Sequence, residues 1–277
     1  MYKRQILKWL LGKLVETFGG IFELYAAMSG NVFDQSVVKT IFTFFQTIGL
    51  PLIGLAMMSM LFKVMLEHAD GKGFQVMDIL KRFVGGVIIY SFGLEIMKSL
   101  YVVLMGVTGK IISVIANVAT EDMKIDFDDF GFSLTSILLV VILTAICIYY
   151  MIKSFMDILE RTWQYVVILC MMYIYTTGYI MGNDESIISW FKQCLAIIFS
   201  QFFQITLVSL GITLYVSAGG VNDFLFGIGA IIASAKVEQL LDRFGMGSGG
   251  RIGNAMRNAM SMGFYGSSII RSFRKGG

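Results

Sequence analysis

Histidine and cysteine are scarce in this chain of 277 residues, and their scarcity argues against several kinds of site. The single histidine, His68, argues against a histidine-built metal centre and against a Ser–His–Asp relay. The three cysteines lie within apolar runs, none forms a CxxC pair, and an odd number cannot all pair within one chain. We interpret them as small buried hydrophobic residues, and we expect no catalytic residue, no metal site and no cofactor.

Charged residues and proline are also few. Charged residues make up 15% of the chain, whereas a soluble domain has about a quarter, and hydrophobic residues make up 56%. The mean hydropathy is +0.75. Pro51 is the single proline, so that glycine rather than proline must interrupt the long helices. This composition indicates one polytopic helical membrane domain.

Five apolar stretches are long enough to cross a bilayer as helices. They are residues 41–66, 83–104, 133–152, 165–181 and 190–217. A further apolar segment, residues 224–235, is short for a full crossing and suits a re-entrant or sixth segment. Residues 1–18 have a basic amphipathic pattern that is typical of a helix in the headgroup region. We therefore predict an all-α polytopic protein with about five transmembrane helices, an N-terminal amphipathic helix and this short segment.

The same pattern divides the chain into three regions. Residues 1–40 form an N-terminal amphipathic or interfacial segment, and residues 41–235 form the transmembrane helical domain. Residues 236–277 form a basic, glycine-rich tail.

The distribution of Lys and Arg predicts how the chain sits in the membrane. The loops 67–82 and 153–162 carry five Lys or Arg residues, and the loops 120–130 and 183–192 carry two. The positive-inside rule therefore places the first pair of loops and the basic tail in the cytoplasm. The N-terminus then lies outside, whereas both ends lie inside if residues 224–235 also cross.

The last long span carries a polar stripe. On a helix its polar members fall within an arc of about 80°. They are Gln193, Ser200, Gln201, Gln204 and Gly211. Such a stripe should face other helices or water rather than lipid. Two interpretations remain open for the glutamines: hydrogen bonding between helices, and the polar lining of a conduit.

A second candidate for a functional site is a pair of charged residues in the second span. Glu95 and Lys98 lie three residues apart, which allows them to pair on one helix. Because ionisable residues at membrane depth are costly, they usually face protein or a wet cavity. The pair could tie spans together, belong to a proton or ion pathway, or form a polar patch at a subunit contact.

Residues 150–250 resemble the TrbL family, the polytopic inner-channel subunits of conjugative type IV secretion systems, in particular their Gram-positive relatives. The run MDILERTWQYVVIL, which contains Arg161, enters a span, and a polar turn then leads into SWFKQCLAIIFSQFFQ. A glycine-containing apolar segment follows, then the amphipathic AKVEQLLDRFG and the basic tail. The similarity is in the order of these features.

The resemblance implies a non-enzymatic membrane subunit that assembles as a homo-oligomer in lipid, beside other secretion subunits and a cytoplasmic transfer ATPase. It would help to pass a relaxase-bound single DNA strand out of a donor cell. From their pattern alone, we assign the glutamines at 193, 201 and 204 to the subunit interior or to the path. We assign to the ATPase side the connector residues Asp157, Glu160 and Arg161 and the tail residues Lys236 and Arg243.

Two other functions remain as alternatives. A small secondary transporter or ion-conducting protein would use the polar stripe and the Glu95–Lys98 pair, but we find no repeat between residues 41–119 and 133–217. A membrane scaffold without a conduit of its own is the second alternative.

Overall fold

The protein is built from helices throughout the part that the computed structural model describes. This part comprises residues 30–69, 76–121, 134–216 and 221–243, and Lys13, Thr17, Gly20, Ile21, Leu24 and Tyr25. Its elements are the 3-10 helix η1 (Gly30–Asp34) and the α-helices α2 (Ser36–Ala69), α3 (Val76–Glu121), α4 (Leu134–Ile180), α5 (Asp184–Val216), α6 (Val221–Ser234) and α7 (Val237–Arg243). The predicted all-α fold is confirmed. Most of the predicted N-terminal amphipathic helix and the tail beyond Arg243 lie outside the described residues.

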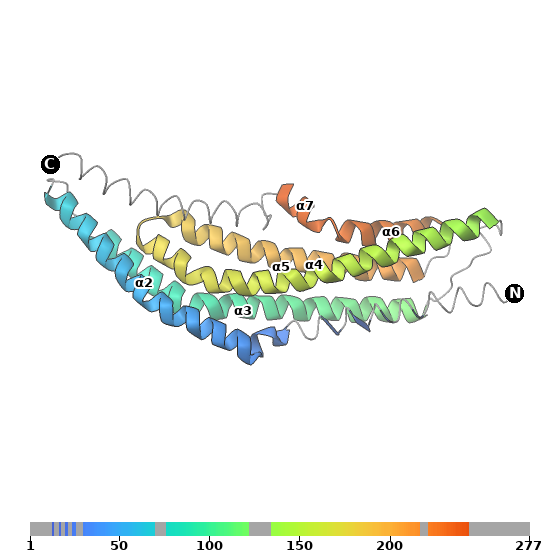
Figure 1. Ribbon diagram of the computed structural model, residues 1–277, viewed down its shortest axis with the longest axis horizontal. Coiled ribbons are helices and arrows are strands. Elements are labelled where there is room, and N and C mark those ends of the chain that lie inside the picture. Colours follow the sequence, from blue (N-terminus) through green and yellow to red (C-terminus); the bar gives the residue numbers. More distant parts are fainter. Residues whose placement is uncertain are drawn as a thin grey trace.

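α3, α4 and α5 run side by side along the molecule, and α2 crosses them at an angle (Figure 1). α4 and α5 are antiparallel, because Trp190 meets Ile168 while Gln201 meets Ile158. α3 is antiparallel to α4 as well, and α2 diverges from the others toward the end where α4 turns into α5 (Figure 1). α6 folds back along α5 at the opposite end and leads into α7.

α4 is one uninterrupted helix, which differs from the sequence-based prediction. We expected two spans, residues 133–152 and 165–181, with a polar connector between them; instead the connector forms the middle of α4. Lys153, Glu160 and Arg161 are good helix formers, and Glu160 accepts a hydrogen bond from Gln164 one turn later at 2.9 Å. No proline occurs in α4, and its single glycine is Gly178, close to its end. Charge in this stretch therefore does not mark a break in the helix.

Four of the described helices are long and apolar enough to cross a membrane. They comprise residues Ser36–Leu66, Ile79–Val114, Val141–Ile180 and Asp184–Tyr215. The predicted short segment appears as the apolar helix Asn222–Ser234. At 1.5 Å per residue, the 47 residues of α4 span about 70 Å, more than twice the roughly 30 Å of a bilayer's hydrocarbon core.

One ion pair corrects the predicted arrangement of the loops. We expected residues 67–82 and 183–192 on opposite sides of the membrane. However, Arg82 Nη1 lies 2.7 Å from Asp184 Oδ1, so the start of α3 and the start of α5 occupy the same end of the bundle. The reason is the continuity of α4. Because α4 is one helix rather than two spans, the turn between α4 and α5 lies on the side opposite to the predicted one.

An aromatic cluster joins the N-terminal elements to the bundle. Tyr101 of α3 and Tyr165 of α4 stack with ring centroids 4.8 Å apart, and Phe33 of η1 packs edge-on against Tyr101 at 5.4 Å. Tyr165 also donates a hydrogen bond to the carbonyl of Met97 at 2.7 Å. Both tyrosines are fully buried, so this cluster is where the three helices are fixed to one another.

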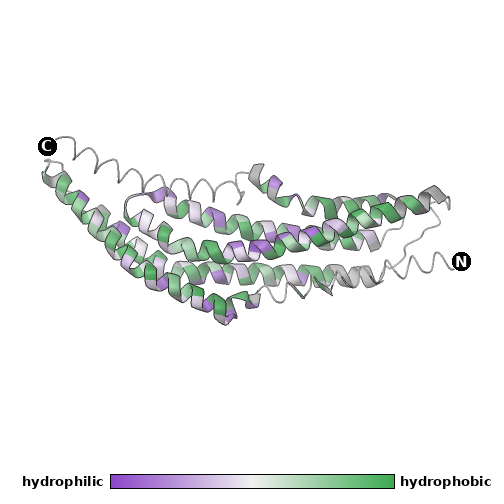
Figure 2. Ribbon diagram, in the orientation of Figure 1, coloured by the Kyte–Doolittle hydropathy of each residue, from purple (hydrophilic) through white to green (hydrophobic). Residues whose placement is uncertain are grey.

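The outer surface is strongly apolar. Large hydrophobic side chains are exposed along α2, α3 and α4, among them Met58, Phe62, Phe92, Tyr149 and Ile152. Hydrophobic residues colour most of the long helices in Figure 2, with hydrophilic residues gathered near the middle and the ends. A soluble monomer rarely exposes so continuous an apolar surface, whereas lipid covers it at no cost. The chain is a helical membrane protein.

Candidate functional site

α5 is the central helix of the protein. It packs against α3, α4, α6 and α7, whereas we expected only its polar stripe to face protein. Ile198 and Ile205 lie outside the stripe and are nevertheless fully buried. Phe203 and Leu210 remain 44% and 43% exposed. Lipid therefore reaches a narrower face of α5 than its sequence indicated.

The polar stripe lies inside the bundle and forms what we call the polar seam: Gln193, Ser200, Gln201 and Gln204 of α5 with the groups that they meet. These four side chains are 2%, 4%, 0% and 0% exposed, respectively. Most of their described partners are on α4, and the seam follows the contact between α4 and α5 over about three turns of helix.

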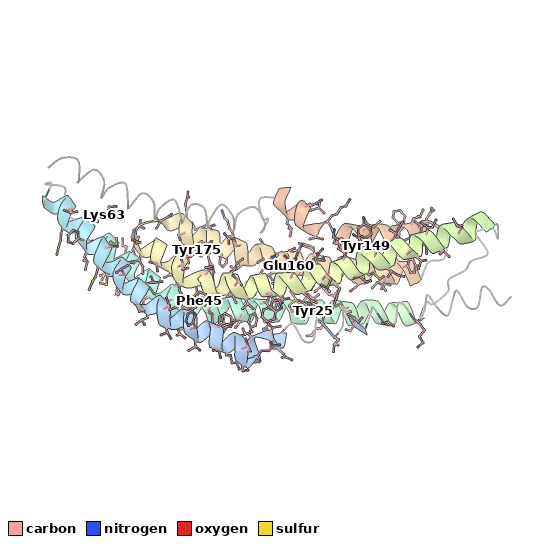
Figure 3. All side chains as sticks on the ribbon, in the orientation of Figure 1. Tyr25, Phe45, Lys63, Tyr149, Glu160 and Tyr175 are labelled. Atoms are coloured by element: carbon pink, nitrogen blue, oxygen red, sulfur yellow. The ribbon has the colours of Figure 1, made fainter. Side chains whose placement is uncertain are left out.

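At the centre of the seam, Gln201 joins α4 to the N-terminal part of the chain. Its Nε2 donates to Thr162 Oγ1 at 2.9 Å and to the carbonyl of Ile158 at 3.1 Å. The hydroxyl of Tyr25 contacts Thr162 Oγ1 and reaches the Ile158 carbonyl at 3.3 Å. Figure 3 shows Tyr25 beside the middle of the long helices. Burial raises the pKa of the Tyr25 hydroxyl, which therefore stays neutral and able to donate.

One turn further along, Gln204 joins α5 to α4, and Ser154 joins α4 to α6. Gln204 Nε2 donates to the carbonyl of Ser154 at 3.2 Å. Ser234 donates its hydroxyl proton to the Ile231 carbonyl at 2.7 Å, so the 2.8 Å contact between the two serine hydroxyls has Ser154 as the donor. Three helices are thus linked through uncharged hydrogen bonds at one level.

At the other end of the seam, Gln193 binds closer to the α4–α5 turn. Its Nε2 donates to Ser189 Oγ at 3.2 Å, and its Oε1 lies 3.5 Å from the Tyr175 hydroxyl. Trp190, one turn earlier, donates from Nε1 to the Ile168 carbonyl at 2.9 Å. These contacts hold the start of α5 against α4.

The Glu95–Lys98 pair forms as the sequence allowed, but at the surface. Lys98 Nζ lies 3.0 Å from Glu95 Oε1, with side chains 19% and 69% exposed. The ammonium also lies over the ring of Phe42, 4.5 Å from its centroid. The pair therefore covers the contact between α3 and α2 and does not meet the polar seam.

The residues that we assigned to a cytoplasmic partner differ in exposure. Glu160 of α4 and Lys236, between α6 and α7, are exposed, and Asp157 is half-buried. Arg161 is only 5% exposed. Arg243 ends α7. Among the side chains of this group that the structure describes, those of Glu160 and Lys236 are exposed.

Sequence reasoning did not identify the partners of the glutamines. Ser154, Ile158 and Thr162 recur every four residues and so share one face of α4, a pattern that was readable in the sequence. The charges around these residues predicted a connector between two spans rather than the middle of one helix. Tyr25 gave no local signal, since it meets Gln201 across 176 positions of the chain.

The seam offers hydrogen bonding rather than chemistry. Its members are amides, hydroxyls and backbone carbonyls, and none is an acid, a base or an activated nucleophile at neutral pH. Among the residues that the structure describes, no group of three or more His, Cys, Asp and Glu could hold a metal ion.

Comparison with known proteins gives a family. No curated protein and no solved structure matches the chain. The family model described as "Conjugal transfer protein TrbL" matches residues 2–274, which is nearly the whole sequence. With its long apolar helices and its inward-facing polar seam, the chain belongs to the TrbL family of conjugal transfer proteins and is a membrane component of a type IV secretion system.

Proposed function

We propose that the chain is a non-enzymatic subunit of the inner-membrane channel, and that it helps to move a relaxase-bound DNA strand across the cell membrane. The observation that carries this proposal is the division of its side chains. The polar residues of α5 face inward and bind α4, whereas the outer faces of α2, α3 and α4 are apolar. This is the construction of a membrane scaffold whose helices are fixed to one another.

The same division supports a conduit between subunits rather than within one. Gln201 and Gln204 are fully buried and bind neighbouring helices of their own chain. A DNA strand would have to separate α4 from α5 to reach them. We therefore assign the glutamines a packing role, and place the path between copies of the chain or between it and other membrane subunits.

The orientation of the bundle follows from its ends. Lys63, Lys81 and Arg82 lie at the end where α2 finishes and α5 begins, whereas the 120–130 loop, at the other end of α3, has a net charge of −4. We propose that the basic end faces the cytoplasm. The start of α2 then faces outward, in keeping with the external N-terminus that we expected. A cytoplasmic transfer ATPase would meet the basic end, whereas Glu160, about 30 Å before the end of α4, would meet other membrane subunits.

Mating experiments test the proposal. Deleting the gene should abolish transfer of DNA to a recipient, and the chain supplied in trans should restore it. The chain purified from membranes should bring down copies of itself, other membrane subunits and a cytoplasmic ATPase. A chain that purifies alone and takes up a solute would instead identify a secondary transporter.

Two variants distinguish a role of the glutamines in helix packing from a role in lining the path of the DNA. If the glutamines pack α4 against α5, Gln201→Leu and Gln204→Leu should each lower the melting temperature and the amount of chain in the membrane. Each loses a hydrogen bond worth about 1 kcal/mol and strands buried polar partners. Phe203→Leu is the matched control, because Phe203 lies between them and is 44% exposed. Normal amounts of assembled chain with no DNA transfer would contradict the packing role.

A further inference from the structure

Four buried oxygens at the polar seam have no hydrogen-bond partner within the part of the chain that the structure describes. They are Tyr101 OH, Ser200 Oγ, Gln201 Oε1 and Gln204 Oε1. Their side chains are between 0% and 4% exposed. Most buried polar groups in proteins are paired, because an unpaired one loses its hydration without compensation. Four at one level of a bundle call for a common explanation.

The orientation of the two amides explains why their oxygens are left over. Gln201 Nε2 faces the carbonyl of Ile158, and Gln204 Nε2 faces the carbonyl of Ser154. A carbonyl oxygen only accepts, so turning either amide over would bring two acceptors together. Each amide is thereby fixed with its nitrogen toward α4 and its oxygen elsewhere. The free oxygens follow from the backbone of α4, not from a choice of rotamer.

The four oxygens belong to neighbouring side chains at the contact of α3, α4 and α5. Gln201 and Gln204 are three residues apart on one face of α5, about 4.5 Å along the helix axis, and Ser200 lies within one turn of both. The Tyr101 hydroxyl of α3 lies among the side chains of Thr162, Tyr25 and Gln201, which places it at the level of the Gln201 amide, although it forms no hydrogen bond of normal geometry with them. The unpaired groups are two obligate acceptors and two hydroxyls.

The geometry points to a site for ordered water between α3, α4 and α5. Water is the ligand that suits these groups, because it donates to the amide oxygens and both donates to and accepts from the hydroxyls. A buried water typically makes about three hydrogen bonds, so one or two molecules satisfy all four oxygens. The seam is then a hydrated layer through the middle of an otherwise apolar bundle, closed to bulk solvent by the helices around it.

Radiolytic footprinting tests this directly on the full-length chain in detergent or nanodiscs. A short X-ray pulse makes hydroxyl radicals from bound as well as bulk water, and mass spectrometry reads oxidation at each tyrosine. Tyr101 should be oxidised several-fold faster than Tyr215. Tyr215 is the matched control, because it is 1% exposed and its hydroxyl is already bonded to Thr144 at 2.8 Å. Equal, background-level oxidation of the two tyrosines would overturn the inference.

Thermal unfolding locates the water on one of these oxygens. Ser200→Ala deletes one unpaired oxygen and no hydrogen bond within the described chain. If water binds there, the variant should melt lower by about 2 °C or more, since removing a bonded hydroxyl costs roughly what a hydrogen bond contributes. If the seam is dry, the variant should melt at the wild-type temperature or above it, and that result would also overturn the inference.

Discussion

Arg82 and Asp184 form a two-pronged ion pair, with Nη1 2.7 Å from Oδ1 and Nη2 3.2 Å from Oδ2. The pair joins the first turns of α3 to the first turn of α5, across 102 positions of the chain. Asp184 also stands at the N-terminal end of α5, where the helix dipole favours a negative charge. The pair therefore places the start of α3 and the start of α5 on the same side of the bilayer.

This pairing predicts that residues 82 and 184 are reached from the same side of the membrane. In a chain without its native cysteines, Arg82→Cys and Asp184→Cys should both react with an impermeant thiol reagent in inside-out vesicles, and neither should react in intact cells. The native cysteines 147, 170 and 194 are buried, so their replacement by Ala removes little surface. Labelling of the two positions from opposite sides would contradict the fold.

The pair should contribute little to stability by itself. Asp184 is 61% exposed, and exposed ion pairs contribute about 0–1 kcal/mol. We expect Arg82→Gln to shift the melting temperature only slightly, and the exchange of the two charges in a double variant to restore it. The measurement is thermal unfolding in detergent at low and high salt.

A third prediction concerns the crossing of α5 and α6. A Cβ on Gly227 would lie 2.7 Å from the backbone nitrogen of Tyr215 and 2.8 Å from the carbonyl oxygen of Gly211. Backbone atoms cannot move aside as a flexible side chain can. Gly227→Ala should therefore push α6 away from α5 and lower stability by about 1–3 kcal/mol.

Gly229 provides the control for this crossing. It lies two residues further along α6, and nothing lies within 4 Å of its Cβ position. Gly229→Ala should be neutral or slightly stabilising, because alanine favours a helix by up to about 1 kcal/mol over glycine. Equal melting temperatures for the two alanine variants would show that the helices do not cross closely at Gly227.

The fold class was predictable because it depends on composition and periodicity, which are local. The inward-facing side of α5 could also be read from the spacing of its glutamines. The continuity of α4 could not, since the charges around Glu160 suggest a loop when no tertiary neighbour is known. The contact of Tyr25 with Thr162 joins distant parts of the chain, and no local pattern encodes it.

A fourth prediction tests the hydrogen bond that anchors the aromatic cluster. Tyr165→Phe removes the 2.7 Å bond to the carbonyl of Met97 and keeps the ring that stacks on Tyr101. We expect a loss of about 1 kcal/mol in the free energy of unfolding. Tyr149→Phe on the same helix is the control, because Tyr149 is 63% exposed and should tolerate the change. A loss of the same size in both variants would show that the Met97 bond contributes nothing specific.

The final prediction concerns Glu160 and Lys236, the charges that we assign to contact with other components of the secretion system. Both are exposed, so Glu160→Lys and Lys236→Glu should leave the amount of chain and its melting temperature unchanged. Reversal of a charge at an interface disfavours the partner through repulsion and slows association. We expect each reversal to lower the frequency of DNA transfer and the yield of copurified partners.

Lys153→Glu is the matched control, because Lys153 is also exposed on α4 but was not assigned to the contact. Transfer at the wild-type frequency in both reversals would remove these residues from the interface, and an equal defect in the control would show that charge in the middle of α4 acts on insertion rather than on a partner.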